Sequence, residues 1–182
     1  MIKRPIEPLD YAGKIAQAIP RGILLTAKAG DEVDTMVIGW GHIGYVWNTP
    51  TFIAYVRTSR HTHALLEQSG AFTVNIPDGP LRKDIFKVAG GESGRHVNKI
   101  EKLGLTLVEP EEIDVPGILE CPITLECEVI YKQHLDEETV PDFAKEWFYP
   151  ADVTDIDAGG NCYYHDVYFG AIEASYIIEQ DE

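Results

Sequence analysis

The segment from Asp34 to Gly44 constrains the fold of this chain most, because it begins as a β-strand and then loses its side chains. Hydrophobic residues alternate from Met36 through Ile38 to Trp40, which is the period of a half-buried strand. Glycines stand at positions 39, 41 and 44. A glycine in a strand either weakens it or lets a ligand approach the main chain closely. The segment therefore predicts a weakened strand end or a backbone surface for a ligand.

A second strand, residues 52–56, leads into a basic turn and a short helix at 62–69, which Gly70 would cap. Helix N-terminal amides, hydroxyls and guanidinium groups supply the hydrogen bonds and the charge that a phosphate monoester requires. The alternative is an ordinary capped helix with solvated arginines. The polar residues of the turn are Arg57, Ser59, Arg60 and Thr62.

These residues also carry a family resemblance. The blocks at 34–40, 57–62 and 70–77 resemble, in order and spacing, the flavin reductase-like FMN-binding split-barrel family, which includes the flavoredoxins. Two more blocks, 93–99 and 125–129, extend the resemblance from about Gly22 to Ile178. The resemblance implies an FMN-binding split barrel. The many strands and few short helices indicate the same class, a mainly β protein built as a β-barrel.

The resemblance further implies FMN as the cofactor, with NADH or NADPH as a possible co-substrate. The backbone of residues 36–41 would meet the pyrimidine edge of the flavin, and the basic turn would bind the phosphate. Arg95 and Lys99 would add charge at the phosphate or help to place a pyridine nucleotide. The expected cofactor-binding residues are Met36, Val37, Ile38, Gly39, Trp40, Gly41, Arg57, Ser59, Arg60, Thr62, Asn75, Arg95 and Lys99.

His165 is the candidate catalytic residue, because the family places a histidine beside the flavin near the start of the matching strand. The alternative for His165 is an ordinary strand histidine. The chain departs from the family at Asp34, Val37 and Gly39, where Asn, Thr and Ser are frequent. Losing two hydroxyl groups leaves the binding of the flavin ring more dependent on main-chain contacts.

Two functional hypotheses follow. The first is an FMN-binding oxidoreductase, acting as an NAD(P)H:flavin reductase or as a flavoredoxin-like electron carrier that receives electrons from a redox protein, and forming a homodimer. The second is a split-barrel module for ligand binding or assembly that has lost flavin chemistry, and the residues favouring it are Val37 and Gly39.

The composition excludes several other classes. The formal net charge of -15 opposes binding to nucleic acid or to anionic membranes. Neither a signal peptide nor an apolar run of membrane-spanning length occurs, so we expect a cytoplasmic protein. The acidic stretch at 155–160 resembles a calcium loop only loosely, since it lacks a ligand at its fifth position, and we expect no metal site.

The 182 residues suit one domain, with an N-terminal arm at 1–20 and an insertion at 135–160. The insertion combines aromatic and acidic residues, and it would cover a flavin, cover a partner subunit, or anchor itself through a small hydrophobic cluster. We expect helices at 11–19, 62–69, 81–88 and 94–103, and strands at 23–29, 36–40, 52–56, 71–76, 105–108, 123–134 and 162–178.

Overall fold

The computed structural model describes residues 2–155 and 161–179. The strands are β1 (Ile2–Pro5), β2 (Ile23–Ala29), β3 (Glu32–Ile38), β4 (Gly41–Val46), β5 (Thr49–Arg57), β6 (Ala71–Ile76), β7 (Leu107–Val108), β8 (Gly117–Ile118), β9 (Ile123–His134) and β10 (His165–Glu179). The helices are α1 (Ala12–Ala18), α2 (His61–Ser69), α3 (Lys83–Gly91), α4 (Lys99–Leu103) and α5 (Asp142–Phe148), with 3₁₀ turns at Pro8–Tyr11 and Ile19–Arg21.

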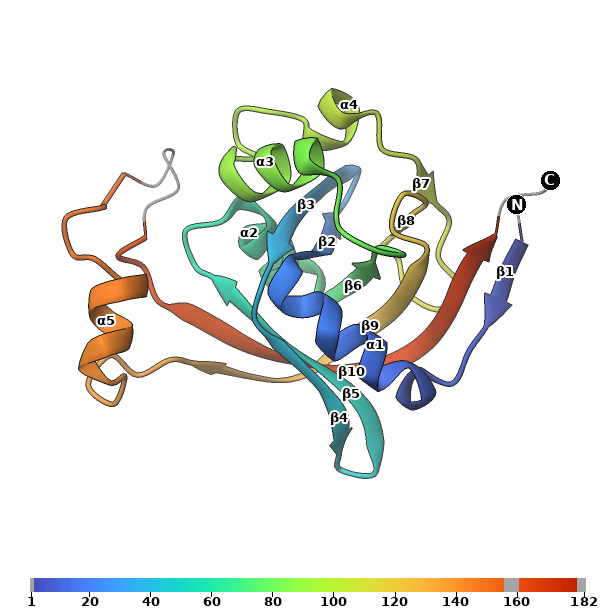
Figure 1. Cartoon of the computed structure of the whole chain (residues 1–182), viewed down its shortest axis with the longest axis horizontal. Coiled ribbons are helices and arrows are strands. Elements are labelled where there is room, and N and C mark those ends of the chain that lie inside the picture. Colours follow the sequence, from blue (N-terminus) through green and yellow to red (C-terminus); the bar gives the residue numbers. More distant parts are fainter. Residues whose placement is uncertain (1, 156–160, 180–182) are drawn as a thin grey trace.

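One antiparallel sheet organises the fold. Its strands follow the order β3-β2-β6-β9-β10-β5-β4, and β1 pairs with the far end of β10. The sheet curls around a core that includes Leu25, Phe52, Phe72 and Leu125. A second cluster, formed around Leu24, lies beneath α3 and the segment after α4. In Figure 1, α1 crosses the front of the barrel, and α3 and α4 lie above β3.

Several predicted elements are confirmed. Strands β2, β6 and β9 have the expected bounds. Helix α2 runs from His61 to Ser69 and is followed by Gly70, which has the left-handed conformation (φ 68°) expected of a C-cap glycine. The mainly β fold class is therefore confirmed.

The strand predicted for 36–40 is wrong at both ends, because β3 already begins at Glu32. Strand β3 stops at Ile38, and Trp40 lies outside the strand with 37% of its surface exposed. The glycines that follow belong to a strand that the sequence did not predict, β4, which forms a hairpin with β5. Its turn uses Trp47 and Asn48, both with positive φ, a backbone that matches the twist of a two-residue hairpin.

Three other bounds also need correction. Helix α4 begins at Lys99 rather than at 94, because the side chain of Asn98 accepts a hydrogen bond from Glu101 N (3.1 Å) and caps the helix there. Strand β7 is only two residues long and pairs with β8, which the sequence did not predict. Strand β10 begins at His165 rather than at 162.

Two extensions leave the barrel. Strands β9 and β10 run out together as an arm, and α5 from the predicted insertion sits at its end (Figure 1). The β4–β5 hairpin forms the other extension. Both expose aromatic rings, with Trp47 66% and Trp147 78% exposed. In the part of the chain that the structure describes, none of the helices is long and apolar enough to cross a bilayer.

Candidate functional site

The end of β3, the end of β5 and the start of β10 surround a hollow of about 130 Å³. Its two basic groups come from the last residue of β5 and from the turn that follows it, and its imidazole comes from β10. Antiparallel pairing of β5 with β10 sets Arg57 opposite His165. The lining residues are Met36, Val37, Ile38, Gly39, Trp40, Tyr55, Arg57, Arg60 and His165. Eight of these nine were predicted from the sequence, and Tyr55 was not.

The Arg57 guanidinium is committed to the protein. Its Nη1 donates to the carbonyl oxygens of Asn161 and Tyr163, both at 2.6 Å, and its Nη2 donates to that of Phe148 at 3.1 Å. The same group lies 5.0 Å from the centre of the Tyr149 ring. Arg57 therefore ties the segment after α5 to the barrel.

Arg60 contrasts with Arg57. Its side chain is half-buried and lines the hollow, and burial lowers the pKa of its guanidinium. Among the residues that the structure describes, no side chain or carbonyl accepts a hydrogen bond from this guanidinium. A partly desolvated cation without an acceptor favours an anionic ligand in the hollow.

His165 is buried, and both sides of its ring are occupied. The Trp40 ring lies 4.8 Å away, and the Tyr149 hydroxyl lies 2.7 Å from its Nδ1. Burial lowers the pKa of His165 to about 3, and the positive charges of Arg57 and Arg60 contribute. The ring is therefore neutral at physiological pH. When Tyr149 donates to Nδ1, the imidazole proton is on Nε2.

Tyr149 was expected only as one of the aromatic residues of the insertion, and it bonds directly to His165. It ends α5, stacks on Tyr164 with centroids 4.3 Å apart, and is almost completely buried. The neighbouring Phe148 meets Trp40 edge to face at 5.0 Å. The insertion therefore packs aromatic rings against Trp40 and His165, two of the residues that line the hollow. The only sequence signal was the cluster of aromatic residues in this segment.

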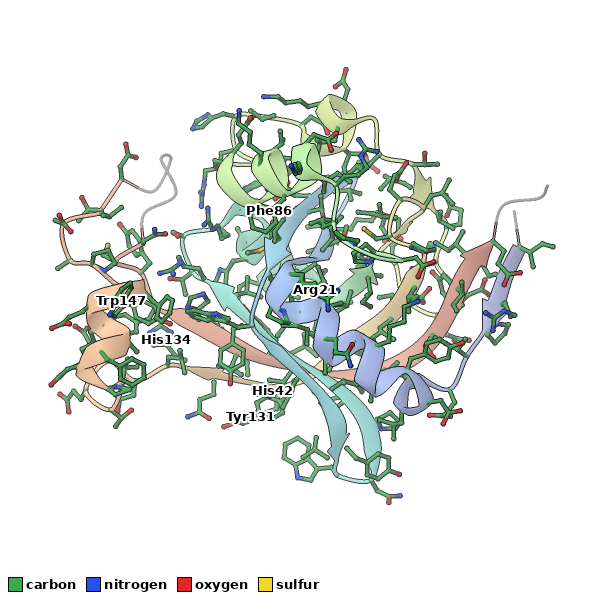
Figure 2. The ribbon with its side chains drawn as sticks, in the orientation of Figure 1. Arg21, His42, Phe86, Tyr131, His134 and Trp147 are labelled. Carbon is green, nitrogen blue, oxygen red and sulfur yellow. The ribbon has the colours of Figure 1, made fainter. Side chains whose placement is uncertain are left out.

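A wider cleft of about 490 Å³ adjoins the hollow. The two share Gly39, Trp40 and Tyr55, so Trp40 stands at the boundary. The cleft is lined mainly by apolar residues from α1, the following 3₁₀ turn and β4, together with His42, which is labelled in Figure 2. It also contains Gly41, whose added Cβ would lie 3.0 Å from the Ile53 carbonyl oxygen.

Two other predicted ligands, Thr62 and Lys99, form a buried network with Asp34, whereas a third, Arg95, is exposed and bonds separately to the basic turn. Thr62 Oγ1 donates to Asp34 Oδ2 (2.6 Å), and Lys99 Nζ donates to the same oxygen (3.1 Å) and to the Thr35 carbonyl (2.7 Å). Arg95 Nη1 donates to the carbonyl of Ser59 (2.9 Å), in the basic turn itself. The network holds the turn in place, and the Thr62 hydroxyl already has its acceptor.

Asn75 lies elsewhere. It is buried in β6, donates to Thr26 Oγ1 and Thr73 Oγ1, and accepts from Ile118 N and Thr124 Oγ1. These bonds hold together neighbouring strands of the barrel, and Asn75 does not line either hollow. The structure gives its side chain a role inside the sheet.

Residues 17–182 match the flavin reductase like domain. The chain belongs to the flavin reductase-like family. An uncharacterized protein of Archaeoglobus fulgidus is 45% identical over 82 residues, which cover 45% of this chain and 46% of that protein. This flavin reductase-like chain therefore spans less than half of that relative.

Solved structures of the family share the fold. An FMN-binding domain of a flavin reductases-like enzyme from Shewanella baltica superposes with a TM-score of 0.63 at 16% identity, covering 97% of this chain and 77% of that one. The flavoredoxin of Desulfovibrio vulgaris gives a TM-score of 0.60 at 21% identity, with coverage of 87% and 69%. The predicted split barrel is confirmed.

Proposed function

We propose that this flavin reductase-like protein binds FMN at the hollow and that NADH or NADPH reduces the bound FMN. The observation that carries the proposal is the Arg60 guanidinium, which is half-buried and has no acceptor within the described part of the chain. A phosphate monoester would supply that acceptor. Arg57 is bonded to three carbonyls, and so we assign the phosphate to Arg60 rather than to Arg57.

The residues around the hollow suit a flavin. The backbone of residues 36–41 would hold the polar edge of the ring, as main-chain groups do not depend on the hydroxyls missing at Val37 and Gly39. Trp40 and His165 supply aromatic and polar contacts at the same place. FMN, when bound, supplies hydride and single-electron chemistry, while these side chains bind it, orient it and exclude water.

The wider cleft supports the reductase role. It shares Trp40 and Tyr55 with the hollow and offers about 490 Å³ of mostly apolar space. A nicotinamide ring needs such a space next to a bound flavin. Electron transfer from a redox protein is the second candidate role, favoured by the exposed aromatic rings of α5 close to the hollow.

We also infer a homodimer. Phe143 and Trp147 on α5 and Trp47 on the β4–β5 hairpin are 65%, 78% and 66% exposed, which is unusual for large apolar side chains on a monomer. A second copy covering them would complete a site at the subunit boundary. Light scattering should give about twice 20.3 kDa, whereas a flavin-bound species of 20.3 kDa would refute a shared site.

The visible spectrum of the purified protein mixed with FMN is the first test, followed by fluorescence titration of FMN and riboflavin. FMN should bind more tightly by roughly 10- to 150-fold, corresponding to one charge-assisted hydrogen bond of about 1.5–3 kcal/mol. Equal affinities would remove the phosphate role of the turn. Failure of both ligands to bind would support the rival function, a binding module without flavin chemistry.

Rates of NADH and NADPH oxidation with excess FMN, compared with reduction by a ferredoxin-type protein, separate the two redox roles. The reductase hypothesis expects oxidation of a pyridine nucleotide that depends on FMN. Reduction of bound FMN by the protein donor alone would instead identify an electron carrier.

A further inference from the structure

A second cluster of potential ligands lies on the other side of β10 from the hollow. Successive residues of a strand point to opposite faces, so Asp166 faces away from the hollow that His165 lines. On that face Asp166 meets His63 and Glu67 from α2 and His134 from β9. Figure 2 labels His134 on the projecting arm. Three elements distant in sequence therefore bring two imidazoles and two carboxylates together.

The distances are those of a compact ligand set. Asp166 Oδ2 is 2.8 Å from His63 Nε2, and Asp166 Oδ1 is 2.7 Å from His134 Nδ1. Ligand atoms of His63, Glu67 and Asp166 all lie within 4.8 Å of one another. Metal–ligand bonds of about 2.0–2.2 Å require donor atoms roughly 3–3.6 Å apart, so a small closure is sufficient for these three residues. His134, whose side chain is 58% exposed and contacts Asp166, must also turn toward them.

The surrounding structure fixes these side chains. His63 and Glu67 are four residues apart on one face of α2. Asp166 is opposite His134 in the β9–β10 register. The Tyr168 hydroxyl donates to Glu67 Oε1 (2.5 Å), an outer contact of the kind that orients metal-binding carboxylates.

A lysine now neutralises the two carboxylates. Lys132 Nζ is 2.8 Å from Glu67 Oε2 and 3.5 Å from Asp166 Oδ2. Its side chain is 39% exposed and has a flexible four-carbon stem, so its ammonium reaches water easily. A divalent cation would supply the same compensating charge and would bond to both imidazoles, which the ammonium cannot do.

We propose that His63, Glu67, His134 and Asp166 bind a divalent transition metal of the Zn²⁺ or Co²⁺ class, with Lys132 displaced to solvent. Two imidazoles with two carboxylates suit these ions better than Mg²⁺ or Ca²⁺, which prefer oxygen ligands. Four protein ligands make a closed, structural site. It would clamp α2, which follows the basic turn, to the β9–β10 arm. The inference does not depend on flavin binding.

The test is titration of the full-length, metal-stripped protein with Co²⁺, followed by absorbance, and then displacement by Zn²⁺. We expect one Co²⁺ per chain with the intense visible bands of tetrahedral coordination, and a higher unfolding temperature with Zn²⁺. Glu67→Gln and His134→Ala should each weaken Co²⁺ by more than about tenfold, the lower limit for losing an outer contact. Both residues are exposed, so the variants should fold.

Two further variants separate this site from surface binding. Lys132→Met should tighten Co²⁺ binding, because no ammonium competes for the carboxylates. His42→Ala removes a histidine outside the cluster and should leave the affinity unchanged. The proposal is overturned if Co²⁺ does not bind, if Glu67→Gln and His134→Ala bind it like the parent, or if Lys132→Met binds it no more tightly.

Discussion

Replacing either arginine of the basic turn should separate cofactor binding from stability. The Arg60 guanidinium makes no hydrogen bond to another described residue, and its backbone bond to the Arg57 carbonyl survives in alanine, so Arg60→Ala should change the free energy of unfolding by less than about 0.5 kcal/mol. In FMN binding it should lose one charge-assisted contact of about 1.5–3 kcal/mol, which weakens FMN by roughly 10- to 150-fold. Arg60→Lys should restore only part of the affinity, because lysine keeps the charge without the planar fork.

Arg57→Ala should behave in the opposite way. It removes three hydrogen bonds to the carbonyls of Phe148, Asn161 and Tyr163, and the contact with the Tyr149 ring. These bonds are part-buried, so we expect a loss of about 2–4 kcal/mol in stability, or roughly 5–15 °C in Tm for a chain of this size. FMN affinity would fall by less than in Arg60→Ala, because only the packing of Phe148 and Tyr149 beside the hollow loosens.

The assays are thermal unfolding without FMN, fluorescence titration with FMN, and turnover at saturating FMN. Arg57→Ala must be the less stable of the two variants, and Arg60→Ala must be the one that binds FMN more weakly. Normal FMN binding by Arg60→Ala would contradict the assignment of the phosphate. Normal binding with slow turnover would place Arg60 at the reactive ring or at the nicotinamide instead. Parent-like stability of Arg57→Ala would refute the structural role of that side chain.

Two other substitutions test neighbouring features. Tyr149→Phe removes the hydroxyl that is hydrogen-bonded to Nδ1 of His165, which should lower the free energy of unfolding by about 1 kcal/mol. Nitrogen NMR of His165 should then show a changed balance between the two imidazole tautomers. An unchanged spectrum would mean that another group orients the ring. Gly94→Ala puts a Cβ 2.6 Å from the buried carboxylate of Asp34 and should destabilise by about 1–3 kcal/mol in thermal melts. Gly91→Ala, which meets nothing within 4 Å, is the matched control, and equal melting of the two variants would contradict the steric argument.

Much of the barrel was predictable from the sequence because it depends on local signals. The period-two pattern and the turn at residues 30–31 define the β2–β3 hairpin, and Gly70 ends α2 by its own backbone preference. The residues lining the hollow were predicted through the family resemblance, which most of them carry in two short segments. Strand β4 was missed because its glycines weaken the strand pattern, and its pairing with β5 is what forms it.

Which arginine is available to a ligand was decided only by tertiary structure. In sequence, Arg57 and Arg60 are equivalent basic residues of one turn. The carbonyls that occupy Arg57 come from residues 91 to 106 positions later in the chain, and no local pattern encodes a contact at that separation. The hydrogen bond of Tyr149 to His165 has the same origin, because it forms only when the arm returns α5 to the barrel. Sequence thus determined the family, the fold class and the chemistry of the side chains, whereas folding determined which of them remain free to act.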